Sequence, residues 1–188
     1  MNPSTEDILN AVEAVPSATV YVLPNNKNIV MAAEQAAKIC KSRRVRVIPT
    51  LTIPQGLSAM LAFEHGGDET ENIIAMNKAA EKVGTGQVTF AARDSEYDGH
   101  KIREGELLGL ENGKVAFTEK DLKKAVTRLV KALLKKDSSF VTLIYGENVT
   151  PEQAAEVETA VREKLPADVD LTLISGGQPV YYFILSVE

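Results

Sequence analysis

The 188-residue sequence has no tryptophan, a single cysteine and only two histidines, and aromatic residues make up 5% of it. The scarcity of aromatic side chains favours a core built from aliphatic residues. Cys40 alone cannot form an internal disulfide or a cysteine metal cluster, so we expect the reducing environment of a cytoplasm. No apolar run approaches the roughly 20 residues that a membrane helix needs, and the polar stretch MNPSTEDIL is unlike a signal peptide.

The sequence also lacks the glycine motifs that hold nucleotide phosphates. Neither a GxxxxGKS/T nor a GxGxxG pattern occurs, and Gly84-Thr85-Gly86 is too short to replace one. We therefore expect no cofactor in this chain. The net charge of −5 argues against nucleic acid as a partner, because binding phosphates requires a basic face.

Catalytic and metal-binding patterns are equally scarce. His65 and His100 lie far apart in the sequence and each stands beside a glycine, as is common for solvated loop histidines. Serines such as Ser175 have no obvious base partner. The sequence thus predicts neither a metal site nor a catalytic residue in this chain.

Helix and strand signals alternate along the first half of the chain. Strands are predicted at Thr19–Leu23 and Val45–Pro49, and helices around them give the order α-β-α-β-α-α. In the helix that follows Thr52, we expect Leu57, Met60 and Leu61 to face inward. Strands joined by crossover helices pair in parallel, so residues 1–90 predict a parallel α/β subdomain.

Residues 91–188 predict a mixed two-layer α+β subdomain. Strand Gln87–Arg93 leads into it, Glu111-Asn112-Gly113 is a hairpin turn signal, and a long basic helix is predicted over Glu119–Lys136. A strand and a second capped helix follow, and two final strands, DLTLIS and VYYFILSV, close the chain. The predicted class is therefore α/β, with a parallel-sheet half followed by a mixed α+β half.

Two polar loops follow the two predicted parallel strands. The first contains Pro24, Asn25, Asn26, Lys27 and Asn28, and the second contains Thr52, Pro54, Gln55 and Gly56. Ligands bind beyond the carboxyl ends of parallel strands, so both loops are expected at one edge of the sheet. A purely structural role fits them as well, because Asn tolerates left-handed turns and caps helices, and Thr52 with Gln55 matches a capping box.

Four motifs together resemble the C-terminal domain of bacterial fatty acid kinases, a family also known as dihydroxyacetone-kinase-like or DAK-phosphatase proteins. They are MNPSTEDIL, VLPNNKNI, VIPTLTIPQGLSAMLAF and SGGQPVYYFILSVE. The resemblance implies a DegV-like fold and a parent kinase about three times as long. It also implies that a separate N-terminal domain binds ATP and magnesium, and that the present chain lacks a preceding strand-helix-strand segment. A sheet edge exposed in this way favours a homodimer.

The resemblance further implies a non-catalytic docking domain for a DegV-type fatty-acid-binding protein. Docking would use Pro24–Asn28 and Thr52–Gly56, with Gly176, Gly177 and Gln178 as a third contact. A first alternative is a lipid carboxylate held at the helix after Thr52, unless Met60, Leu61 and Phe63 fill that space. A second alternative, a glycerone kinase-like enzyme fragment, lacks an ATP motif in this chain.

Overall fold

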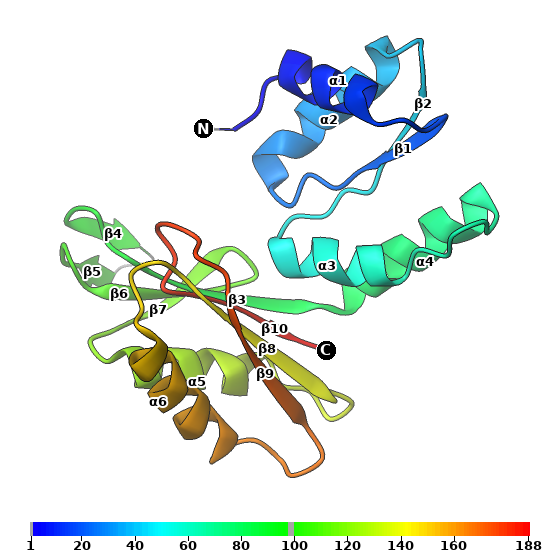
Figure 1. Ribbon diagram of the computed structural model, residues 1–188. Helices are drawn as coiled ribbons and strands as arrows, with labels where there is room; N and C mark the ends of the chain where they lie inside the picture. The colour runs from blue at the N-terminus through cyan, green and yellow to red at the C-terminus, as the bar shows by residue number, and fades with distance from the viewer. Residues whose placement is uncertain (1, 98–99) are drawn as a thin grey trace. The chain divides into compact units, whose positions relative to one another are not determined.

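The computed structural model describes residues 2–97 and 100–188, and the chain divides into two compact units, Met1–Val83 and Gly84–Glu188 (Figure 1). The first unit contains two strands and four helices. They are α1 (Thr5–Ala14), β1 (Thr19–Val22), α2 (Lys27–Ile39), β2 (Arg44–Val47), α3 (Ile53–Leu61) and α4 (Glu69–Lys82).

The first unit has helices on both faces of a parallel strand pair. Strands β1 and β2 pair in parallel, with Val20 opposite Val45. These two valines pack against the buried faces of α1 and α2, where Val12 and Ala33 lie. On the other face, Ile48 packs with the buried residues of α3 and α4, and Tyr21 lies against them. The predicted parallel arrangement with crossover helices is confirmed for this unit.

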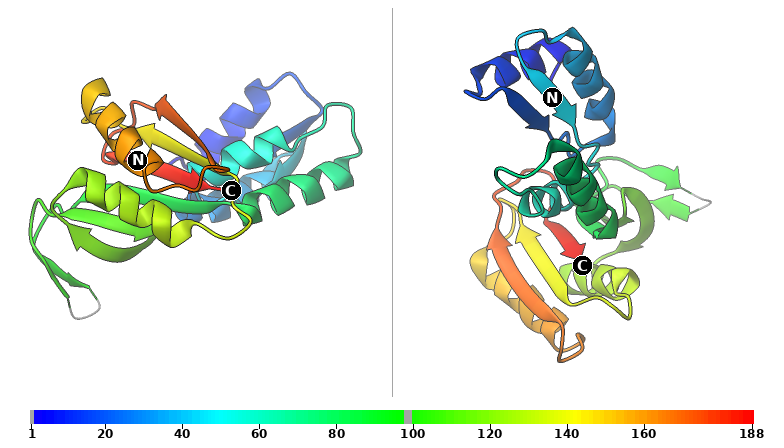
Figure 2. Two further views of the ribbon diagram at one scale, coloured as in Figure 1. Left: turned by 90° about the horizontal axis from the view of Figure 1, so that it is seen from below. Right: turned by 90° about the vertical axis from the view of Figure 1, so that its right-hand side faces the viewer.

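The second unit is a six-stranded sheet with two helices on one face and a small separate strand pair. The strands are β3 (Gly84–Phe90), β4 (Ser95–Tyr97), β5 (His100–Ile102), β6 (Leu107–Glu111), β7 (Lys114–Glu119), β8 (Phe140–Tyr145), β9 (Asp170–Ser175) and β10 (Phe183–Val187). Helices α5 (Leu122–Leu133) and α6 (Pro151–Arg162) pack against the sheet (Figures 1 and 2).

The sheet of the second unit is mixed, in the order β7-β6-β3-β10-β8-β9. Its neighbouring strands are antiparallel except for β8 and β9, which run parallel. The core lies between this sheet and the two helices, with Leu129, Phe183 and Leu185 at its centre. The mixed two-layer arrangement that the sequence predicts is therefore confirmed.

Strand β3 begins earlier than the sequence suggests. We expected Gly84-Thr85-Gly86 to end a helix and the strand to run over Gln87–Arg93, but these glycines already lie in β3. A Cβ atom on Gly86 would stand 2.7 Å from Cδ1 of Leu185, the residue opposite it on β10. The glycine is needed there because the side chain of Leu185 occupies the space.

Candidate functional site

The two polar loops of the first unit meet in the structure. The first connects β1 to α2, and the second connects β2 to α3. The backbone amide of Asn25 donates a hydrogen bond to Oγ1 of Thr50 at 3.2 Å, and that hydroxyl donates to Oδ1 of Asn25 at 2.8 Å. Thr50 is 1% exposed, so this pair joins the loops from beneath. The expectation that both loops lie at one edge of the sheet holds in the described fold.

The contact between the loops depends on two unusual backbone positions. Asn25 has a φ of 56°, in the left-handed region that Asn tolerates better than most residues. Its side chain lies directly over Gly56 in α3, where an added Cβ would stand 2.1 Å from Oδ1 of Asn25. Gly56 therefore lets α3 approach the first loop closely.

Most of the predicted polar residues are used within the loops. The side chain of Asn26 caps α2 by accepting a hydrogen bond from the amide of Asn28 at 2.9 Å. Thr52 caps α3 by accepting from the amide of Gln55, and Oε1 of Gln55 accepts from the amide of Leu51 at 2.8 Å. These bonds stiffen both loops, and they fit the structural role that the sequence left open.

Exposure divides the predicted loop residues into two groups. Pro24, Pro54 and Gly56 are buried, and Asn25, Asn26, Thr52 and Gln55 are half-buried. Lys27 and Asn28, at the start of α2, are exposed. A partner approaching this edge would therefore touch Lys27 and Asn28 more readily than the asparagines beneath them.

Helix α3 faces the opposite way from our expectation. We predicted that Leu57, Met60 and Leu61 would point inward, but they are 44%, 60% and 88% exposed. The buried side of α3 instead carries small residues, namely Pro54, Gly56, Ser58 and Ala59. The small residues allow the helix to approach Asn25 and the core residue Ile48, which leaves the large side chains outside.

The outward side of α3 thus forms an aliphatic strip, which we define as Leu51, Ile53, Leu57, Met60 and Leu61, all at least 44% exposed. Just beyond the helix, Phe63 is 39% exposed and packs edge-on against Tyr21 at a centroid distance of 5.3 Å. The sequence carried a signal for this surface. Apolar residues occur almost all round α3, which a helix at the surface of a lone domain does not require.

The third predicted loop belongs to the second unit, at the carboxyl end of β9. Its residue Gln178 turns inward, where Nε2 donates to the backbone oxygen of Ile144 at 3.0 Å. A Cβ on Gly176 would stand 2.1 Å from Oε1 of Gln178, so the glycine leaves room for that side chain. Gly177 has a φ of 61°, a left-handed conformation that suits glycine. Gln178 therefore holds the loop, and its exposed residues are the two glycines, Pro179 and Val180.

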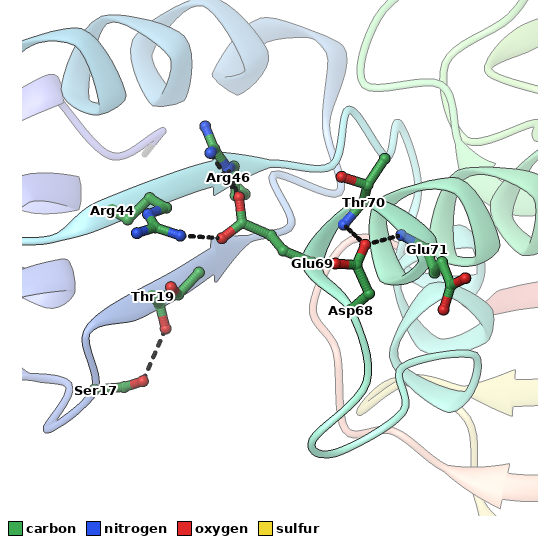
Figure 3. A network of polar contacts seen from close by, with 8 residues as sticks. All are labelled: Ser17, Thr19, Arg44, Arg46, Asp68, Glu69, Thr70 and Glu71. Atoms are coloured by element: carbon green, nitrogen blue, oxygen red, sulfur yellow. Dashed lines mark hydrogen bonds and ion pairs between the residues drawn. The ribbon is translucent and has the colours of Figure 1, made fainter.

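An ion-pair network that the sequence did not reveal lies on the α4 side of β2 (Figure 3). Glu69, the first residue of α4, accepts from Nη1 of Arg44 at 2.8 Å and from Nε of Arg46 at 2.6 Å. These hydrogen bonds, from Arg44 first and Arg46 second, lower the pKa of the Glu69 carboxyl. The alternation in Arg44-Val45-Arg46-Val47 explains the placement, because alternate residues of a strand face opposite sides of the sheet.

Metal-ligand geometry is absent from the part of the chain that the structure describes. In residues 2–97 and 100–188, no three His, Cys, Asp or Glu side chains come together as possible ligands of one ion. None of the described helices is long and apolar enough to span a membrane. The chemistry of the described site is therefore that of a stiff polar edge beside an exposed aliphatic strip.

Comparison with known families identifies the domain. The family model for the C-terminal domain of fatty acid kinase A-like (FakA-like) proteins matches residues 1–188. The chain belongs to this family. Relatives of this fatty acid kinase domain include Protein YloV of Bacillus subtilis, at 41% identity, and an uncharacterised protein of Staphylococcus haemolyticus, at 39%, over 188 residues in each case. The chain spans about a third (34%) of the length of both relatives.

Solved structures establish the fold of this fatty acid kinase A-like domain as DegV-like. A DegV family protein from Corynebacterium glutamicum aligns with a TM-score of 0.70 at 14% identity, covering 99% of this chain and 82% of that protein. A fatty-acid-binding DegV family protein from Thermus thermophilus aligns at 0.68 with 17% identity, covering 98% and 77%. The dihydroxyacetone kinase of C. freundii in complex with AMP-PNP and Mg²⁺ aligns at 0.66 with 16% identity, covering 98% and 41%.

Proposed function

We propose that this chain is the docking domain of a fatty acid kinase and receives a DegV-type fatty-acid-binding protein. The bound fatty acid would then be phosphorylated by an ATP- and magnesium-binding domain elsewhere in the parent protein. The relatives are about three times as long as the chain, which leaves room for such a domain. The chain itself would contribute recognition and no catalytic residue, in the cytoplasm that its lone Cys40 suggests.

One observation carries the proposal, namely the orientation of α3. A helix that buries small residues and exposes Leu57, Met60 and Leu61 keeps large apolar side chains in water. Contiguous apolar surface of this kind marks interaction sites, and clustered large side chains supply most of the energy of a typical interface. The aliphatic strip would form the apolar centre of the docking surface, with Lys27 and Asn28 at its polar margin.

The stiffness of the adjoining loops supports the same function. Asn25, Thr50 and Gly56 lock the two loops together before any partner arrives. A surface that is already ordered loses little conformational entropy on binding. Gly176, Gly177 and Gln178 in the second unit remain a predicted third contact.

The test is a calorimetric titration of the chain with a lipid-loaded DegV-type fatty-acid-binding protein of the same organism, without ATP. We expect saturable binding near one to one. The variant Leu57→Ser/Met60→Ser should bind at least about ten-fold more weakly, because it removes two apolar side chains from the centre of the surface. Both side chains are exposed, so the fold should persist, as circular dichroism would verify.

A matched control is available on α4. Ile74 is 60% exposed, as is Met60, and Ile74→Ser should leave the affinity unchanged. Lys27→Ala tests the polar margin better than a change of Asn26, because Asn26 also caps α2. No binding by the folded chain, or equal weakening by Ile74→Ser, would show that α3 does not carry the docking.

A fatty acid bound by the chain itself is a second candidate, and the exposure of Met60 and Leu61 favours it over the view that they fill the space. A carboxylate could accept hydrogen bonds at the start of α3, with its acyl chain along the aliphatic strip. Mass spectrometry of an organic extract of the purified chain would reveal a co-purified fatty acid. An extract without lipid, together with no calorimetric signal on adding oleate, would leave docking as the sole candidate.

A further inference from the structure

A second surface, remote in sequence from the docking loops, lies between α5 and α6 on the outer side of the second unit. The two helices pack side by side on one face of the sheet (Figures 1 and 2). Between them runs a groove of about 1260 Å³. Its apolar lining comes from both helices and the turn after α6, and consists of Val130, Leu134, Ala160, Val161, Leu165 and Pro166.

The α5 wall of this groove is basic along its length. Lys124, Arg128 and Lys131 follow one another at helical spacings of four and three residues, which places them in one row about 10 Å long. Lys164 adds a fourth cation near the end of α6. The helix α5 itself contains four basic residues and no acidic one.

These cations are only partly neutralised by the chain. Lys123 pairs with Glu156 across the groove at 3.2 Å, and the Arg128 guanidinium lies 4.0 Å from the ring centroid of Phe117. Within the described residues, Lys124, Lys131 and Lys164 form no ion pair, and all three are exposed. On the opposite wall, Glu163 is the acidic residue that stands beside Lys164.

We propose that this groove binds an amphipathic α-helix of a partner protein that carries a row of carboxylates along one flank. A groove between two packed helices accepts the side-chain ridge of a third, and apolar residues of that helix would lie on the lining. The row of cations would face the carboxylates on the flank of the bound helix, which gives the partner its chemistry and its direction.

The spacing of the cations distinguishes this partner from a lipid. A fatty acid or a phospholipid concentrates its negative charge at one end, whereas three cations spread over about 10 Å match a row of charges. A membrane-bound helix also presents large apolar side chains to the bilayer. Among the residues that the structure describes, none of the large exposed hydrophobic side chains belongs to α5 or α6.

The experiment uses the whole chain and a synthetic helical peptide of about 18 residues, or about five turns, with leucines at i, i+3, i+4 and i+7 and glutamates along one flank. Calorimetry should show saturable binding near one to one that weakens when salt is raised from about 0.05 to about 0.3 M. The variant Lys124→Glu/Lys131→Glu should bind this peptide at least about ten-fold more weakly, and should prefer a peptide with lysines in place of the glutamates.

The matched control is Lys38→Glu/Lys114→Glu, which changes the net charge equally at two exposed lysines outside the groove. It should bind the acidic peptide like the unchanged chain. Equal weakening by the control pair would reduce the effect to bulk charge and overturn the proposal. So would the absence of peptide binding, or binding to vesicles containing phosphatidylglycerol that replaces peptide binding and is lost in the groove variant.

Discussion

At the scale of single residues, the joint between the two polar loops makes the sharpest prediction. Gly56→Ala would place a Cβ 2.1 Å from Oδ1 of Asn25, an atom that already accepts a hydrogen bond from the Thr50 hydroxyl. The side chain of Asn25 therefore cannot move away without losing that bond. We expect the substitution to lower the free energy of unfolding by about 1–3 kcal/mol, as overpacking of a tight site does.

A double-mutant cycle tests the cause of this loss. Urea unfolding followed by circular dichroism would give the four stabilities of the chain, Gly56→Ala, Asn25→Gly and the double variant. Asn25→Gly keeps the left-handed backbone accessible and removes the clashing amide. Gly56→Ala should then cost much less in the Asn25→Gly background. Equal costs in both backgrounds would mean that the contact between these two residues is not what excludes a side chain at position 56.

At the scale of elements, the ion pairs of Glu69 connect α4 to β2 and predict a dependence on pH. Hydrogen bonds from Arg44 and Arg46 lower the pKa of Glu69 in the folded chain. A lowered folded-state pKa means that the stabilisation is present above the ordinary glutamate pKa of about 4.3 and is lost as the pH falls through the lower, folded value. Glu69→Gln should therefore be less stable than the unchanged chain at pH 7, and the difference should shrink in acid.

The control for Glu69 lies in the same first turn of α4. Glu71 is exposed and has the same favourable position at a helix N-terminus, but within the described residues its side chain makes no ion pair. Thermal unfolding from pH 7 down to pH 3 should thus separate Glu69→Gln from Glu71→Gln. A Glu69→Gln variant that is as stable as Glu71→Gln at pH 7 would contradict the assigned role of the two arginines.

The helices also show what the sequence can and cannot predict. The start of α6 was predictable because the Thr150–Gln153 capping box depends on four consecutive residues, and both of its hydrogen bonds form. The inward face of α5, with Val126 and Leu129, followed from helical spacing alone. The orientation of α3 was not predictable in that way, because periodicity assumes that large apolar residues face the core of the same chain. The site repeats this pattern: its caps are local, whereas the contact of Asn25 with Thr50 spans 25 residues.

At the scale of the whole molecule, the open edges of the first unit predict self-association. Within the described residues, β1 and β2 pair only with each other. The amide of Ile48 donates to Val22 and that of Arg44 to Ala18, so alternate groups of β1, at Thr19 and Tyr21, point away from β2. Unpaired strand edges attract another strand, and a second copy of the chain supplies one. Light scattering should therefore show a mass that rises with concentration toward that of a dimer.

The variant Thr19→Pro distinguishes strand pairing from other modes of association. It removes an outward-pointing amide at the first residue of β1, a position where a sheet tolerates proline. The variant should remain folded and stay monomeric at concentrations where the unchanged chain dimerises. An unchanged chain that scatters as a monomer at every concentration would refute the homodimer. A dimer that persists in Thr19→Pro would instead move the contact away from this edge, and the exposed aliphatic strip on α3 would be the next surface to test.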